Sequence, residues 1–286
     1  MGSAVIHEEF NSANADITIQ SCDNVRFCLH RKNLEVTTGG LPGKTSDMID
    51  GVLYLPEPAK VLELLFLFTY PQRSPTHLHD LDCDSLLDIS EAAEKYKVFF
   101  AISVSVSGLR SFTSTEPLKT LRHALKYDHL DLADEAAPNA LFCNPTLVVT
   151  GLSDTYIVPW LLYQSLAYKK IFEKAESTLK AFQNTFTYCK VEQRGICVTC
   201  RTVIAAWIWQ LKQLSTTEAL LFELEKFEQY PNSNLELARD FCEGSCNTHR
   251  RCIYAAEISE HCKVGLQKSQ KFSEYLLDHR VEDGSG

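Results

Sequence analysis

The stretch that most constrains this fold is Leu81–Gly108. On a helix, its apolar side chains recur at steps of three and four residues and make one buried stripe, with charged side chains opposite. The next segment, Val98–Val106, is almost wholly apolar. We therefore predict an amphipathic helix that runs on into the middle of a core. The apolar stripe consists of Leu86, Ile89, Ala93, Tyr96 and Phe100, and the charged side of Asp84, Asp88, Glu91 and Lys95.

Short strands precede this stretch. Apolar and polar residues alternate in Ala15–Ser21, which predicts a strand with one face inward. Asp23-Asn24 predicts a turn that leads into a returning strand at Val25–Leu29. Val52–Leu55 predicts a third strand. These segments indicate a small sheet that needs a helical layer to cover its apolar face.

The segments around these strands are of three kinds. Residues 1–14 are polar, and we predict a flexible arm there. His30 begins a short helix, and the Gly-rich segment Thr37–Asp50 is predicted to be a mobile loop. Ala59–Tyr70 is apolar on nearly every side, which is typical of a buried helix.

The second half of the chain is predicted to be helical. Apolar residues at helical spacing predict a long helix that starts at Pro159, and Trp207 and Trp209 on a later helix cannot both face inward. Shorter helices are expected at Leu118–Leu125, Leu132–Leu141 and Val203–Leu214, with capping boxes at Ser215–Glu218 and Ser233–Glu236. We predict an α+β class, with a flexible arm (1–14), a sheet-containing domain (15–112), a helical region (113–187) and a cysteine-rich helical region (188–286).

The composition excludes several classes of protein. The chain has 286 residues, of which 45% are hydrophobic and 23% charged, so it is long enough for about two domains. A net charge of −9 argues against nucleic acid or an anionic membrane as the main partner, because both are bound through basic surface. No apolar run reaches the roughly 20 residues of a membrane span, and no secretory signal is present. We expect an intracellular protein of the cytoplasm, the nucleus or both.

Eleven cysteines raise the question of a metal site. Cys197 and Cys200 have the spacing of a zinc knuckle, and Cys242, Cys246 and His249 lie at helical spacing further along the chain. Structural zinc bound by these residues would make the second half a zinc-stabilised scaffold. Cysteines packed as small apolar residues, or paired in a disulfide, are the alternatives.

Catalysis by a cysteine nucleophile is a further alternative. The candidate pairs of a thiol and its general base are Cys246 with His249 and Cys262 with His261. Residues that are neighbours in sequence rarely have the aligned geometry that such a pair needs. Neither a phosphate-binding glycine loop nor a hydrolase or metalloprotease motif occurs. We expect no enzymatic activity and no cofactor other than the zinc considered above.

Four signals follow one another in an order that is known from a common domain. They are Asp16–Ile19 in the first strand, His30 and a basic residue after the second, Leu62–Tyr70 ahead of a loop, and Leu87–Tyr96. In this order and spacing, residues 15–112 resemble a BTB/POZ domain. The resemblance implies a short β-sheet with helices.

A closer resemblance is to the BTB-domain proteins abundant in mushroom-forming fungi. It is carried by LPEPAKVLELLFLFTYPQR, EAAEKYKV and DEAAPNAL, by Val158-Pro159-Trp160, and by the cysteine-bearing second half. This resemblance implies a non-enzymatic protein–protein interaction module that binds protein partners and often forms a homodimer. In many BTB proteins it also implies an adaptor that brings a substrate to a cullin-type ubiquitin ligase.

Glu35–Asp50 departs from the family pattern. Typical BTB domains have a helix with a Ser and a buried Phe here, followed by another helix, whereas this segment is short, Gly-rich and nearly empty of large apolar residues. In the family this region contributes to the dimer interface and to cullin contact. We assign the candidate interaction surface to Arg31 and Lys32, before the segment, and to Met48 and Ile49 near its end.

Overall fold

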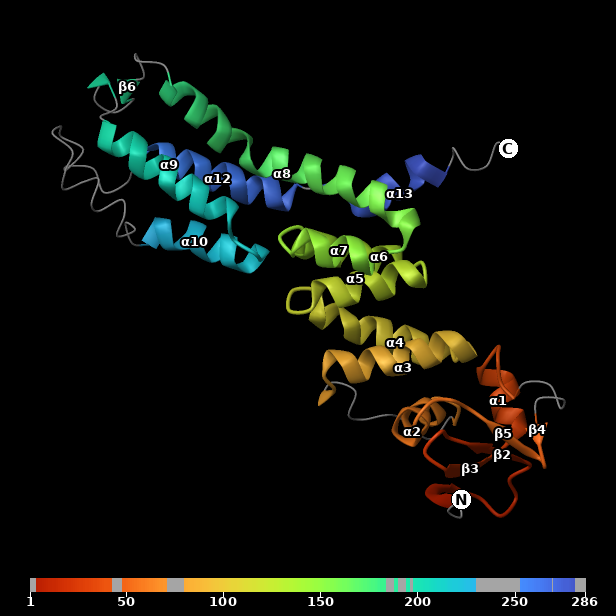
Figure 1. The fold of residues 1–286 in the computed structure, drawn as a ribbon. Coiled ribbons are helices and arrows are strands. Elements are labelled where there is room, and N and C mark those ends of the chain that lie inside the picture. The colour runs from red at the N-terminus through yellow and green to blue at the C-terminus, as the bar shows by residue number, and fades with distance from the viewer. Residues whose placement is uncertain are drawn as a thin grey trace. The chain divides into compact units, whose positions relative to one another are not determined.

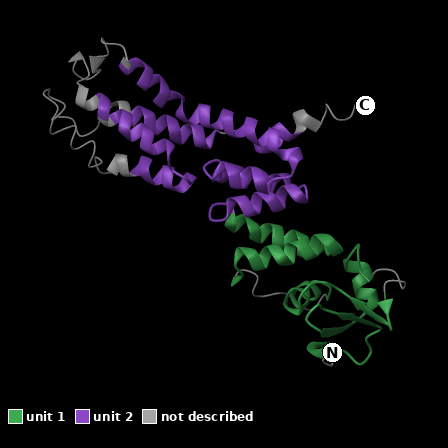
Figure 2. Cartoon of the chain, in the orientation of Figure 1, with its two compact units in different colours: residues 1–112 green, residues 113–286 purple. Residues whose placement is uncertain are grey.

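The computed structural model describes two compact units, residues 1–112 and 113–286 (Figure 2). The first combines a small mixed sheet with helices and the second is mainly helical, so the predicted α+β class is confirmed at this level. The residues described are 4–42, 48–70, 80–183, 188–189, 194–195, 198–229, 253–268 and 270–280.

Unit 1 is built on a five-stranded sheet of order β1-β3-β2-β5-β4 (Figure 1). The central pairing places Ile19 beside Phe27 on one side and Leu53 on the other, which makes one face of the sheet apolar. This face packs against α2 and α3 and forms the hydrophobic core of the unit. The strands are β1 (Val5–Asn11), β2 (Ile17–Gln20), β3 (Val25–Leu29), β4 (Met48–Ile49) and β5 (Val52–Tyr54).

The prediction of a flexible arm over residues 1–14 was wrong for Val5–Asn11. This segment forms strand β1, which pairs in parallel with β3 at the edge of the sheet. Phe10 is buried, with its ring centroid 5.8 Å from that of Phe27 and 6.1 Å from that of Phe66. The segment was missed because long-range contacts hold it, and its local pattern is dominated by exposed Glu8 and Glu9.

The predicted continuous helix over Leu81–Gly108 is broken into two helices. Lys97 takes a left-handed conformation with φ of 51°, and a bridge between Thr38 and Val98 crosses the break. The backbone N–H of Gly40 donates to the carbonyl of Tyr96 at 2.9 Å in the same place. Pairing with a distant segment therefore interrupts a helical pattern that is locally continuous. The helices of unit 1 are α1 (Arg31–Thr37), α2 (Ala59–Leu67), α3 (Cys83–Tyr96) and α4 (Phe99–Leu109), followed by the 3-10 turn η3 (Arg110–Phe112).

The same bridge corrects the prediction of a mobile loop at Thr37–Asp50. The Thr38 hydroxyl donates to the carbonyl of Leu41 at 2.8 Å and accepts from its N–H at 3.0 Å. Leu41 is buried in the core, and the segment ends in strand β4. Residues 43–47 lie outside the described part of the chain.

Unit 2 is organised around the long helix α8, which packs along α12 and α13 (Figure 1). As predicted, Trp160, Tyr163 and Ile171 are buried on one side of α8, although the helix starts at Asp154 rather than at Pro159. The helices are α5 (Pro117–Lys126), α6 (Leu130–Ala140), α7 (Pro145–Gly151), α8 (Asp154–Gln183), α9 (Val198–Lys212), α10 (Thr217–Gln229), α12 (Ile253–Gln267) and α13 (Phe272–Arg280).

Three details of unit 2 depart from or refine the predictions. A two-stranded pair, β6 (Tyr188–Cys189) with β7 (Arg194–Gly195), interrupts the expected all-α region. The hydroxyl of Thr216, and not that of Ser215, accepts from the N–H of Ala219 at the start of α10, at 3.0 Å. Trp207 is buried and Trp209 is 64% exposed, as the helical spacing required. The second capping box lies outside the described residues.

None of the helices that the structure describes is long and apolar enough to cross a membrane.

Candidate interaction surface

Arg31 and Lys32 occupy the first turn of α1, which is held in place by polar contacts from other elements. The N–H of Arg31 donates to Asp16 Oδ1 at 2.6 Å. The His30 ring lies between the Tyr70 hydroxyl, 3.1 Å from Nδ1, and Asn14 Oδ1, 3.2 Å from Nε2. His30 therefore has a structural role at the point where the chain enters α1. Lys32, in the first turn of this helix, is exposed to solvent.

Met48 and Ile49 form the short edge strand β4, and the structure gives the two residues different roles. Met48 pairs with Leu53 and packs against the core, whereas Ile49 pairs with Val52 and is 64% exposed. Ile49 is therefore the member of this pair that exposes an apolar side chain to solvent. Within the described residues, no hydrogen bond or ion pair joins β4 to Arg31.

The outer face of the sheet extends the surface around Ile49. Side chains alternate between the two faces of a strand, so Tyr54 lies on the same side as Val52, two residues before it. Tyr54 is 47% exposed and pairs laterally with Gln20, whose Oε1 accepts from Arg26 Nε at 2.8 Å. Tyr54 could not be recognised from the sequence, because an aromatic residue in a short strand is as typical of a buried position as of an exposed one.

A second exposed apolar group lies at the start of α4. Phe99 and Phe100 are 56% and 63% exposed, although the sequence had predicted Phe100 on the buried stripe. The break at Lys97 rotates α4 relative to α3, and this rotation removes Phe100 from the stripe. One edge of Phe100 still meets Phe68, with ring centroids 5.8 Å apart. Two adjacent large apolar side chains exposed together make this place a candidate binding surface.

The turn behind these phenylalanines is locked by a carboxylate. The Tyr96 hydroxyl donates to Glu57 Oε2, and Lys95 Nζ lies 2.6 Å from Glu57 Oε1. Burial is the main cause that raises the pKa of Tyr96 well above its usual value, and the adjacent Glu57 carboxylate raises it further. The hydroxyl therefore keeps its proton and donates the hydrogen bond. The acceptor of the Tyr96 hydroxyl is therefore Glu57, which lies in a segment distant from α3 in the sequence.

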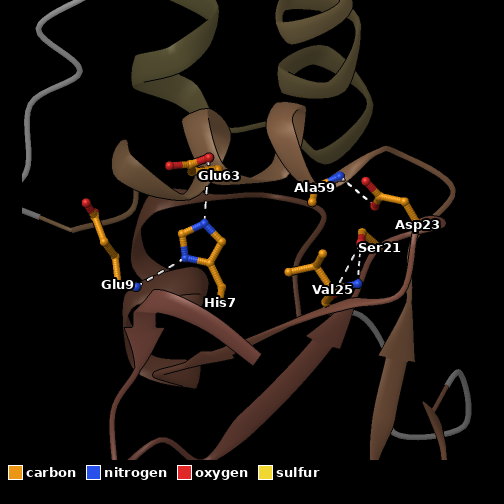
Figure 3. A network of polar contacts seen from close by, with 7 residues as sticks. All are labelled: His7, Glu9, Ser21, Asp23, Val25, Ala59 and Glu63. Atoms are coloured by element: carbon orange, nitrogen blue, oxygen red, sulfur yellow. Dashed lines mark hydrogen bonds and ion pairs between the residues drawn. The ribbon is translucent and has the colours of Figure 1, made fainter. Parts of the chain in front are cut away.

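Two polar tethers connect the sheet to α2 (Figure 3). His7 Nε2 lies 3.6 Å from Glu63 Oε2, and the His7 ring stacks on Phe27 at 4.8 Å between centroids. Asp23 Oδ1 accepts from the N–H of Ala59 at 2.8 Å, at the start of α2. The hydrogen bond from the Ser21 side chain lowers the pKa of Asp23, and the hydrogen bond from the Ala59 N–H lowers it further. Polar contacts therefore join the sheet to α2 at both His7 and Asp23.

The predicted zinc ligands are not placed by the structure. Cys197, Cys242, Cys246 and His249 lie outside the described residues, and for Cys200 only the backbone, in α9, is described. In the described part of the chain, no group of three or more His, Cys, Asp or Glu side chains could hold a metal ion. The zinc site stays a prediction from spacing.

The thiol–imidazole pairs considered for catalysis differ in what can be said of them. Cys246 and His249 are outside the described residues. Cys262 is buried in α12, and burial raises the pKa of its thiol to about 12. The neighbouring His261 places Nε2 3.1 Å from the carbonyl of Lys170. Cys262 is therefore a protonated, packed thiol at neutral pH, and this environment does not activate a nucleophile.

Comparison of the chain with protein-family models, with curated proteins and with solved structures found no match. The resemblance to BTB/POZ proteins rests on the sequence motifs given above.

Proposed function

We propose that this chain is a non-enzymatic protein–protein interaction module whose first unit is a BTB/POZ-like domain. The sequence motifs support the proposal. The element order β2-β3-α1-β4-β5-α2-α3 also supports it, because β2, β3, α2 and α3 fall at the segments where the motifs occur. The unit binds a protein partner or a second copy of itself. Its adaptor role toward a cullin-type ubiquitin ligase is the more specific form of the proposal.

The exposed pair Phe99–Phe100 carries this proposal. An exposed large apolar side chain gains free energy when a partner covers it, and aromatic residues are enriched among those that dominate binding energies. The pair projects from a turn that Tyr96 and Glu57 hold, so little conformational freedom is lost on binding. Ile49 and Tyr54 offer a second apolar area on the sheet.

Affinity capture with the full chain tests the proposal. We expect the double variant Phe99→Ser/Phe100→Ser to capture at least tenfold less partner than the wild type. Its melting temperature should stay within a few degrees of that of the wild type. The control Phe222→Ser removes an equally exposed aromatic from unit 2 and should keep the partner. Undiminished capture by the double variant would contradict the assignment of this surface. Absence of a cullin from the captured proteins would remove the adaptor role and leave the binding module.

A further inference from the structure

An exposed apolar stripe runs along the first half of α8. Val158, Leu161, Leu162 and Leu166 are between 44% and 55% exposed. They lie at positions i, i+3, i+4 and i+8, so they share one side of the helix and cover about 12 Å of its length. The opposite side carries Trp160 and packs on α12 and α13. The stripe is therefore not needed to hold α8 in the fold.

The stripe ends sharply in both directions. On its C-terminal side the same face of α8 continues with Lys169, Glu173 and Glu176, and Glu176 forms an ion pair with Lys212 of α9 at 2.8 Å. On its N-terminal side the helix begins with exposed Asp154. The stripe is thus a bounded apolar patch with Asp154 at its N-terminal end and Lys169 next to its C-terminal end.

We propose that this patch binds the same patch of a second copy of the chain, with the two α8 helices antiparallel. A two-fold axis at Leu162 brings Val158 of one copy level with Leu166 of the other, because both are four residues from the axis. The same axis brings Asp154 within one residue, about 1.5 Å, of the level of Lys169 of the other copy. One operation therefore matches both the apolar side chains and the opposite charges.

The antiparallel arrangement follows from the charges. In a parallel pair, each Asp154 would lie level with the Asp154 of the other copy, and each Lys169 with the other Lys169, so like charges would repel. A self-complementary patch of this kind is what an isologous dimer uses. This inference concerns unit 2 and does not depend on the proposed function of unit 1.

The size of the patch sets the expected strength of the dimer. Stable interfaces bury about 800 Å² on each partner, and four half-exposed apolar side chains supply less than that. We therefore expect a reversible dimer with a dissociation constant in the micromolar range, in which Leu162 at the centre contributes most.

Sedimentation velocity of the full chain over a range of concentrations tests the proposal. Leu162→Glu should weaken dimerisation tenfold or more, because the axis would place two carboxylates side by side. Leu147→Glu on α7 makes the same change at a similarly exposed leucine of the same unit and should leave the dimer unchanged. Circular dichroism melts check that both variants keep their fold.

Charge reversal distinguishes this interface from any other. Asp154→Lys and Lys169→Asp should each weaken the dimer severalfold, and the double variant should restore it. A strictly monomeric wild-type chain at 100 μM (on the order of a hundredfold above a dissociation constant of about 1 μM), or equal dimerisation of Leu162→Glu and Leu147→Glu, would overturn the proposal. Self-association lost only in Phe99→Ser/Phe100→Ser would also overturn it, while the proposed function of unit 1 would stand.

Discussion

Burial decides the protonation of individual side chains in this molecule. Tyr96 and Cys262 both have pKa values above their usual range, and in both the first cause is loss of contact with water. Their surroundings then give them different roles. Tyr96 finds a carboxylate acceptor in Glu57 and locks a turn, whereas Cys262 fills space between α12 and its neighbours.

The buried thiol predicts an alkaline loss of stability. The pKa of Cys262 is raised from 9.0 to about 12, so between these values the folded chain keeps a proton that the unfolded chain releases. The stabilising contribution is therefore complete below pH 9 and is lost as the pH rises from 9 toward 12. We expect the melting temperature of the wild type to fall more steeply over this range than that of Cys262→Ala. Parallel curves from circular dichroism melts would contradict the assignment.

At the scale of elements, several helices receive their N-terminal hydrogen-bond acceptors from elsewhere in the chain. Helices α1 and α2 have no side-chain cap of their own. Asp16 accepts from the first turn of α1, Asp23 from that of α2, and Asp134 of α6 from the N–H of Ser273 in α13. By contrast, α3 is capped locally by Asp82. Long-range capping of this kind joins each helix to the layer it packs on.

Removal of one such cap should be measurable. Asp23→Ala deletes the acceptor of the Ala59 N–H, and we expect a loss of about 1 kcal/mol in the free energy of unfolding at pH 7. Because the pKa of Asp23 is lowered in the folded state, its contribution is present above the ordinary value of 3.8 and is lost as the pH falls through the lowered value.

Urea unfolding at pH 7 and at pH 3 measures this effect. Asp88→Ala makes the same change at an exposed position in the middle of α3 and should cost far less. Asp23→Asn keeps an oxygen acceptor and should fall between the wild type and Asp23→Ala. An equal effect of Asp23→Ala and Asp88→Ala would show that the tether to α2 contributes nothing.

At the scale of the whole molecule, each unit contains a glycine that lies close to the backbone of another segment of the same unit. A Cβ atom on Gly40 would lie 2.9 Å from the carbonyl oxygen of Tyr96 in unit 1. A Cβ atom on Gly265 of α12 would lie 2.9 Å from the Cα of Ile171 on α8 in unit 2. In both places the obstacle is backbone, which cannot move aside as a flexible side chain does.

These two glycines test whether the units unfold independently. We expect Gly40→Ala to lower the free energy of unfolding of unit 1 alone, and Gly265→Ala that of unit 2 alone, each by about 1–3 kcal/mol. The melting temperature of the affected unit should fall accordingly. Differential scanning calorimetry should resolve two transitions, of which each variant shifts one. Gly39→Ala is the control for unit 1, because the nearest atom to its Cβ belongs to the Lys97 side chain, at 3.1 Å, and not to backbone. One transition shifted equally by both variants would show a single cooperative molecule.

The candidate surface was predictable only in part. Ile49 was assigned from its place in the sequence and is exposed, and the inward side of α8 around Trp160 followed from periodicity. Phe99 and Phe100 were placed in the core because an apolar run favours burial, and nothing local marks the break at Lys97. The zinc ligands around Cys200 are not tested by the described residues.

The sequence by itself determined which sides of the strands and helices are apolar, because side-chain periodicity depends only on local backbone geometry. It therefore identified β2, β3 and the buried side of α8. Only the tertiary structure decided whether an apolar side meets a core or the solvent. Strand β1 is held by Phe27 and Phe66, and the helix break is held by Thr38, all distant in sequence. Such contacts depend on how distant segments pack, and local periodicity carries no record of them.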